Sequence, residues 1–174
     1  DSQTGKYKNS RATAIFNKSY ELYHLERVKK GSGKAPEIYL MEGFMDVIAA
    51  YRAGIENAVA SMGTALTSEH VEHLKRFTKK VIVTYDGDKA GQAATAKALD
   101  ELKDIPVHVV QIPDAMDPDE YLQKNSPQDL AYLLTNTRIS PVEFYIHHFR
   151  PENSENLQAQ IEFIEKIAPL IAKE

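Results

Sequence analysis

The sequence lacks cysteine altogether. This absence excludes disulfides and cysteine-ligated zinc sites. The chain also lacks the run of about 18 apolar residues that a membrane span needs, and it opens with no signal-peptide pattern. No P-loop, dinucleotide-binding fingerprint or nucleophile elbow is present. We therefore expect a cytoplasmic protein without a membrane partner, whose chemistry rests on other groups.

Charge is distributed unevenly along the 174 residues, although the net charge is only −4. Residues 1–34 hold eight Lys and Arg against three acidic residues, whereas residues 35–174 hold thirteen against twenty-two. A basic strip beside an acidic body suggests a site that handles both an anion and a cation. A solvated basic tail is the plainer alternative.

Short runs of strand-forming residues alternate with helical patterns. Strands are expected at 37–42, 57–61, 80–86 and 107–113, with helices at about 44–54, 67–77 and 90–102. Helices of these lengths between strands predict βαβ units, so the fold class is α/β with a mainly parallel sheet of about four strands flanked by helices. Each strand is almost continuously apolar, as a sheet covered on both faces requires.

The pattern after Pro113 is helical throughout. Ser126 and Ser140 each precede a proline, a pairing typical of a helix start, and a helix from about Leu157 carries an apolar stripe. We predict a basic segment at 1–34, an α/β domain at 35–125 and a small helical subdomain at 126–174.

Acidic residues follow three of the predicted strands. Because ligands bind beyond the carboxyl ends of parallel strands, these acids are expected on one rim of the sheet. They are Glu42 and Asp46 after the first strand, Asp86 and Asp88 after the third, and Asp117 and Asp119 past the fourth.

Several carboxylates this close need a cation to offset their repulsion. All the candidate ligands are oxygens, which favours Mg²⁺ or Mn²⁺ over zinc. Two such ions about 3.5–4 Å apart could stabilise both the attacking and the leaving oxygen in phosphoryl transfer. The sequence therefore predicts a divalent-metal site.

Each residue also has a plainer interpretation. Asp-Gly-Asp is a common surface turn, Asp117 could be an N-cap, and Asp46 suits a first helical turn. Glu42, a charge that ends an apolar strand, has no obvious structural task. His70 and His73 lie three apart on a predicted helix and are expected to face solvent rather than a metal.

Four segments carry a resemblance to a known family. In order and spacing, "EGFMD", "ASMGTALT", "YDGDKAG" and "PDAMDPDEY" resemble the Toprim domain of bacterial DnaG-type primases. The upstream "KYKNSRATAIFNKSYELY" is similar to the segment that leads into Toprim in that family. The resemblance runs from about Gly5 to about Asn125, and the helical remainder fits the same polymerase core.

This resemblance implies a Rossmann-like Toprim fold in a fragment of a DNA-directed RNA polymerase that makes short primers for replication. It implies Glu42, Asp86 and Asp88 as catalytic residues and the six acids as ligands of two or more Mg²⁺ or Mn²⁺ ions, with no zinc in this fragment. Lys6, Asn9 and Lys18 match residues that contact nucleotides or nucleic acid. The implied partners are a single-stranded DNA template, nucleoside triphosphates and an RNA primer, and a replicative helicase that binds through a domain absent here.

Three alternatives stay open. The chain could belong to another Toprim protein with topoisomerase-like or nuclease-like chemistry. Tyr51, Tyr85 and Tyr121 are the candidate nucleophiles for that alternative, although core packing or a contact at the rim is the favoured interpretation of each. The chain could instead bind metal and nucleotide without independent activity. A phosphoacceptor receiver domain fits less well, because that module needs an acidic pair after the first strand.

Overall fold

The computed structural model describes residues 11, 13, 17, 19, 21–28, 33–152 and 155–172. Helix α1 (Leu25–Val28) precedes the sheet. The strands are β1 (Ile38–Met41), β2 (Ala58–Ala60), β3 (Val81–Val83) and β4 (Val107–Val109). The other helices are α2 (Phe44–Arg52), α3 (Ser68–Phe77), α4 (Lys89–Glu101), the 3-10 turn η1 (Pro113–Ala115), α5 (Pro118–Lys124), α6 (Pro127–Asn136), α7 (Pro141–Phe149) and α8 (Leu157–Ile171). Within these ranges no helix has the length and apolar character to cross a membrane.

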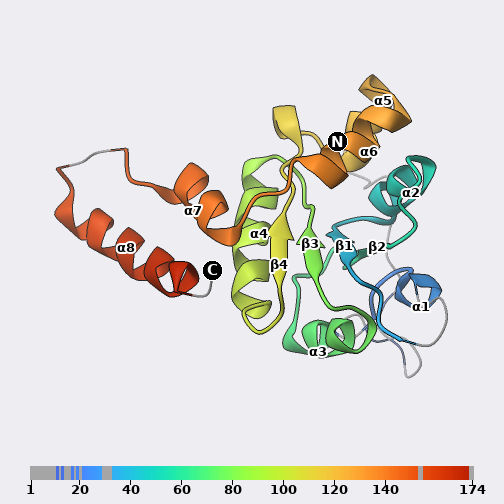
Figure 1. Cartoon of the computed structure of the whole chain (residues 1–174), viewed down its shortest axis with the longest axis horizontal. Helices are drawn as coiled ribbons and strands as arrows, with labels where there is room; N and C mark the ends of the chain where they lie inside the picture. Colours follow the sequence, from blue (N-terminus) through green and yellow to red (C-terminus); the bar gives the residue numbers. More distant parts are fainter. Residues whose placement is uncertain are drawn as a thin grey trace.

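The four strands form one parallel sheet in the order β2-β1-β3-β4. This arrangement confirms the predicted α/β fold (Figure 1). The strands are shorter than predicted: β3 ends at Val83 rather than at Asp86. The pairing continues one residue further, since the Thr84 amide donates to the Leu40 carbonyl at 2.8 Å. Asp86 therefore lies on a loop just past the sheet.

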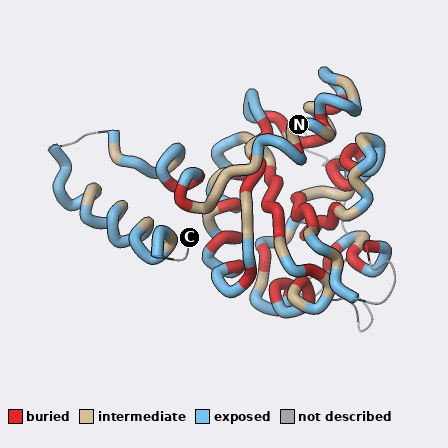
Figure 2. The backbone as a smooth tube through the Cα atoms, viewed as in Figure 1, coloured by how far each residue is buried: buried red, intermediate tan, exposed pale blue. Residues whose placement is uncertain are grey.

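Apolar side chains cover both faces of the sheet. Alternate residues of β1 point to opposite sides: Ile38 and Leu40 pack with α3, α4 and α7, while Tyr39 and Met41 pack with α2, α5 and α6. The molecule thus has three layers, with the buried residues concentrated in the strands and the inner sides of the helices (Figure 2). Helices α6 and α7 belong to these layers although they follow residue 125, and the predicted domain bounds stay a prediction.

Local signals in the sequence place the helix starts. The side chains of Thr67, Ser126 and Ser140 each accept a hydrogen bond from the amide three residues later, which satisfies a donor that the first helical turn leaves unpaired. Gly54 follows α2 with φ +85°, a conformation that glycine adopts without steric cost. These predicted boundaries are confirmed.

One expectation from the sequence was wrong. His70 and His73 do not face solvent: their exposed fractions are 0% and 7%, because the His70 ring turns back to accept from the Thr67 amide and His73 packs edge-on against Phe77. The predicted apolar stripe of α8 is largely exposed, since Leu157 and Ile164 are 69% and 57% exposed. Figure 2 shows α8 exposed along most of its length.

Arg138 joins the end of α6 to the start of β1. Its guanidinium donates to both Glu37 oxygens, at 2.6 and 2.8 Å, and to the Tyr39 hydroxyl at 2.6 Å. Because this charged network is partly buried and the Tyr39 hydroxyl would lose its partner, Arg138→Ala should lower the free energy of unfolding by about 1–3 kcal/mol. Urea denaturation measures the loss. The control is Lys75→Ala, which removes an exposed pair with Glu72 and should cost under about 0.5 kcal/mol; equal losses would contradict this role for Arg138.

Candidate metal centre

Glu42 directly follows β1 at the carboxyl edge of the sheet. Its carbonyl accepts from the Met62 amide at 2.9 Å, and its Oε1 accepts from the Asp86 amide at 3.3 Å. Met62 holds a left-handed φ of +61°, an uncommon conformation for a residue with a side chain. The turn after β2 and the loop after β3 thus position Glu42 from two sides.

Asp46 lies in the first turn of α2 and is only 5% exposed. One carboxylate oxygen accepts from the Gly43 amide at 3.1 Å, and the other accepts from the Asp119 amide at 3.3 Å. The plainer interpretation of Asp46 as a residue of a first helical turn is therefore correct. The contact with Asp119 also links the loop after β1 to the start of α5.

Glycines set the shape of the loop that holds Asp86 and Asp88. A Cβ added to Gly87 would lie 2.1 Å from the Ile112 carbonyl oxygen, and one added to Gly91 would lie 2.0 Å from that of Asp86. Both distances are far inside van der Waals contact, so only glycine fits. Asp88 caps α4 by accepting from the Gly91 amide at 2.7 Å.

Asp117 caps α5, as the plainer interpretation held. Its Oδ1 accepts from the Glu120 amide at 2.6 Å, and the Glu120 carboxylate accepts from the Asp117 amide at 3.1 Å. The loop before this cap is interlocked with the loop after β3, because the Gly87 amide donates to the Met116 carbonyl at 2.9 Å. The cap uses Asp117 Oδ1, so the other carboxylate oxygen of Asp117 takes no part in the reciprocal hydrogen bonds with Glu120.

Burial and mutual repulsion disfavour the charged forms of four of the acids. Burial raises the pKa of Asp86 to about 7, with Glu42 as the strongest of its acidic neighbours. Burial also raises the pKa of Asp46 to about 7, reinforced by the charge of Asp117. The pKa values of Glu42 and Asp117 are raised too, first by burial and then by other acids. The six acids therefore share one electrostatic neighbourhood.

These residues fit a divalent cation. Asp86 Oδ1 is buried and accepts no hydrogen bond, a costly state that a nearby positive charge relieves. The donors are carboxylate oxygens, which suit Mg²⁺ or Mn²⁺. Across the described ranges, however, no three acidic or histidine side chains stand close enough to hold a single ion. We expect side chains such as that of Glu42 to adjust when an ion binds.

Sequence reasoning placed the acids but missed the supports around them. It assigned no steric role to Gly87 and Gly91, although the spacing of "DGDKAG" carried that signal. It also missed the contact between Asp46 and Asp119, which depends on the docking of α5. Lys6, Asn9 and Lys18 lie outside the described residues, so their predicted contacts with nucleotides stay a prediction.

Comparison with known proteins identifies the class. Residues 39–122 match the Toprim-like family, and this span runs from within β1 to within α5, covering the other three strands, most of β1 and all six acids. Residues 39–122 therefore form a Toprim-like segment. Over nearly its whole length the chain is similar to part of DnaG-type DNA primases and of their solved catalytic domains.

The chain is 53% identical over 173 residues to the DNA primase of Lactococcus lactis subsp. lactis, an alignment that covers 99% of this chain and 27% of the relative. The solved DnaG primase catalytic domain bound to ssDNA superposes with a TM-score of 0.81 at 30% identity, covering 99% of this chain and 57% of that one. A DNA primase domain from Pseudomonas aeruginosa gives 0.80 at 32% identity, with 97% and 54% covered. The chain thus spans about a quarter of the curated primases it matches.

Proposed function

We propose that this chain is the metal- and nucleotide-handling part of a DNA primase, the enzyme that joins ribonucleotides into short primers on a DNA template. The observation that carries the proposal is that six carboxylates from the segments after three parallel strands influence one another electrostatically. The similarity to primases over 99% of the chain supports it. The reaction class is nucleotidyl transfer.

The acids have distinct tasks in this proposal. Glu42 is held by the Asp86 amide and its raised pKa suits a group that accepts a proton from the attacking 3′-hydroxyl or organises a metal. Asp86 and Asp88 are ligands on one loop, with Asp46, Asp117 and Asp119 completing the set. Two or more Mg²⁺ or Mn²⁺ ions, when bound, supply neutralisation of the triphosphate charge.

The substrates follow from the same reaction. The proposed partners are a single-stranded DNA template, nucleoside triphosphates and the growing RNA primer. The basic residues 1–34 supply cations for phosphates, which contribute to affinity without reading sequence. The replicative helicase would bind another part of the longer protein.

Topoisomerase-like chemistry through a tyrosine nucleophile is disfavoured at this site. Tyr85, the tyrosine next to Asp86, is only 5% exposed, and burial raises the pKa of its hydroxyl, which makes it a poor nucleophile. Tyr121 packs partly against the core. If DNA became covalently trapped on the protein, the primase proposal would be wrong.

Metal-dependent binding of a nucleoside triphosphate tests the proposal. The chain should bind ATP in Mn²⁺ and lose that affinity in EDTA, and Glu42→Gln should weaken binding of the Mn²⁺ complex at least about tenfold, as loss of a group in a metal site does. Calorimetry measures both. The control is Asp104→Asn. Asp104 is exposed and precedes β4, at the amino end of that strand and away from the candidate metal centre, so this variant should bind the Mn²⁺ complex normally. If the Glu42→Gln and Asp104→Asn variants bound the Mn²⁺ complex of ATP equally well, the site would be rejected. If the full-length protein carrying Glu42→Gln still synthesised primers, the catalytic role of Glu42 would be rejected.

A further inference from the structure

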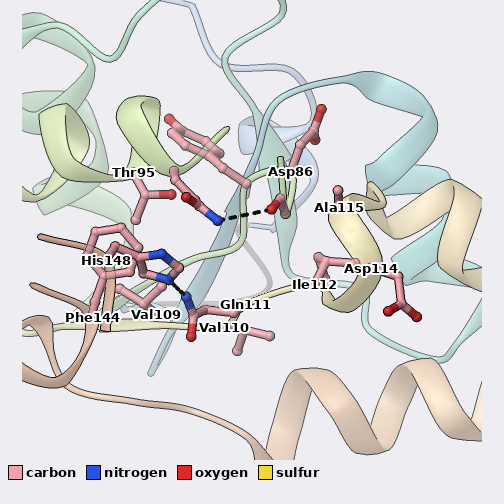
Figure 3. A pocket seen from close by; sticks show the side chains of 13 residues that line it. Asp86, Thr95, Val109, Val110, Gln111, Ile112, Asp114, Ala115, Phe144 and His148 are labelled. Carbon is pink, nitrogen blue, oxygen red and sulfur yellow. Dashed lines mark hydrogen bonds between the residues drawn. The ribbon is translucent and has the colours of Figure 1, made fainter. Parts of the chain in front are cut away.

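A cavity of about 250 Å³ opens beside the Asp86 carboxylate. It lies past the carboxyl ends of β3 and β4, on the side covered by α4 and α7. Figure 3 shows Asp86 and Ala115 on one side of it, with Thr95, Phe144 and His148 on the other. The cavity adjoins the candidate metal centre but enters no step of the proposed reaction.

The walls of the cavity suit a flat ring. The His148 ring is partly exposed, and the buried Phe144 ring packs behind it with centroids 4.9 Å apart and planes at 40°. Val109 and Ile112 add aliphatic surface from the end of β4 and the loop after it. Aromatic faces favour stacked or edge-on contact with another aromatic ring. The volume is below the 300–1,000 Å³ or so of pockets for larger ligands, so it suits one ring system.

The uncharged polar side chains of the lining are the amides of Gln92 and Gln111, the hydroxyls of Tyr85 and Thr95, and the His148 ring. Gln92 donates to the Gly87 carbonyl at 3.2 Å, and the Gln111 amide contacts the His148 ring. An amide offers both a donor and an acceptor, which matches the edge of a nucleobase. Burial lowers the pKa of His148, so its ring is neutral at neutral pH.

A phosphate does not fit this lining. The charged groups there are the carboxylates of Asp86 and Asp114, and no Lys or Arg lines the cavity in the part of the chain that the structure describes. The described lining therefore offers no cation to the anionic end of a nucleotide, whereas a neutral ring needs none. Asp86 belongs to both the cavity wall and the acidic cluster.

We infer that this cavity is a subsite for the base of a nucleotide whose phosphates lie at the neighbouring carboxylates. The inference deepens the proposed function and rests on it for the position of the phosphates. Binding of the base itself depends on the His148 ring, which Phe144 supports from behind, and on the two amides. It can be tested without metal.

The first experiment uses adenosine, which has no phosphate, with the whole chain in EDTA. Adenosine at millimolar concentration should shift the NMR signals of the His148 ring and the Thr95 methyl group. His148→Ala should weaken this binding about tenfold, the effect of losing one stacking contact. His147→Ala is the control, because His147 is exposed and does not line the cavity. No shift at His148 or Thr95 would overturn the subsite, as would equal effects of the two variants.

The second experiment separates the base from the phosphates. In Mn²⁺, wild-type chain should bind ATP about tenfold more tightly than inorganic tripolyphosphate, and His148→Ala should remove that difference while leaving tripolyphosphate affinity unchanged. Equal affinity of the wild type for the two ligands would overturn the subsite. If the wild-type chain bound neither ATP nor tripolyphosphate in Mn²⁺, the proposed function would be rejected. The adenosine experiment would still decide the subsite.

Discussion

Replacing Asp86 with asparagine should weaken Mn²⁺ binding by this chain more than about 100-fold. Asp86 is surrounded by the charges of Glu42, Asp46, Asp117 and Asp88, so it is the acid most central to the cluster. Losing one outer partner of a metal ligand already costs about 10–100-fold in affinity, and losing a ligand should cost more. Titration of Mn²⁺ followed by electron paramagnetic resonance measures the change. Unchanged affinity would remove Asp86 from the site.

Stability of the same variant shows whether the fold survived. In metal-free chain the pKa of folded Asp86 is about 7, above the value of about 4 in unfolded chain. The folded state therefore binds more protons between these values, and the free energy of unfolding falls as pH rises from about 4 to about 7. Asp86→Asn lacks this contribution, so in EDTA its stability should fall less over that window. A variant less stable than wild type at pH 8 in EDTA would contradict this account.

Replacing Gly91 with alanine should lower the free energy of unfolding by about 3 kcal/mol or more and should weaken metal binding. The new Cβ would lie 2.0 Å from the Asp86 carbonyl oxygen, and neither backbone can yield without moving the loop of Asp86 and Asp88. Overpacking a fixed backbone costs about 1–3 kcal/mol, and this contact also breaks the N-cap at Asp88. Thermal and urea denaturation measure the loss.

Ala90→Gly is the matched control for this prediction. Ala90 is the exposed neighbour of Gly91 in the first turn of α4, and its replacement should cost about 1 kcal/mol or less, the ordinary helix penalty of glycine. If Gly91→Ala cost no more than Ala90→Gly, steric exclusion would not explain the glycine. Retained Mn²⁺ affinity in Gly91→Ala would show that the loop tolerates the shift.

The two predictions concern different demands on the same loop. The carboxylates supply charge, and their burial makes that charge unfavourable until a cation is present. The glycines allow the loop to approach Ile112 and to turn directly into α4. Both demands lie in one stretch of six residues, "DGDKAG", so a change in either is expected to reach the metal centre.

The sequence by itself determined the layered architecture. Apolar strands separated by helical patterns predicted a parallel sheet, because only a sheet covered on both faces needs strands such as Ile38–Met41 to be apolar throughout. Thr67, Ser126 and Ser140 marked helix starts through hydrogen bonds that span only three residues. The candidate acids followed from the same topology, since parallel strands end at one edge.

Tertiary structure decided what depends on contacts between distant segments. Periodicity along α8 predicted an apolar stripe, but α7 and the end of α4 contact only part of that helix, so Leu157 and Ile164 are exposed. His70 looked like a surface residue because its neighbours are polar, yet a bond to the Thr67 amide buries it. The contact of Asp46 with the Asp119 amide and the cavity beside Asp86 depend on how α5 and α7 dock. Such docking is set by packing across the whole core, which no local pattern encodes.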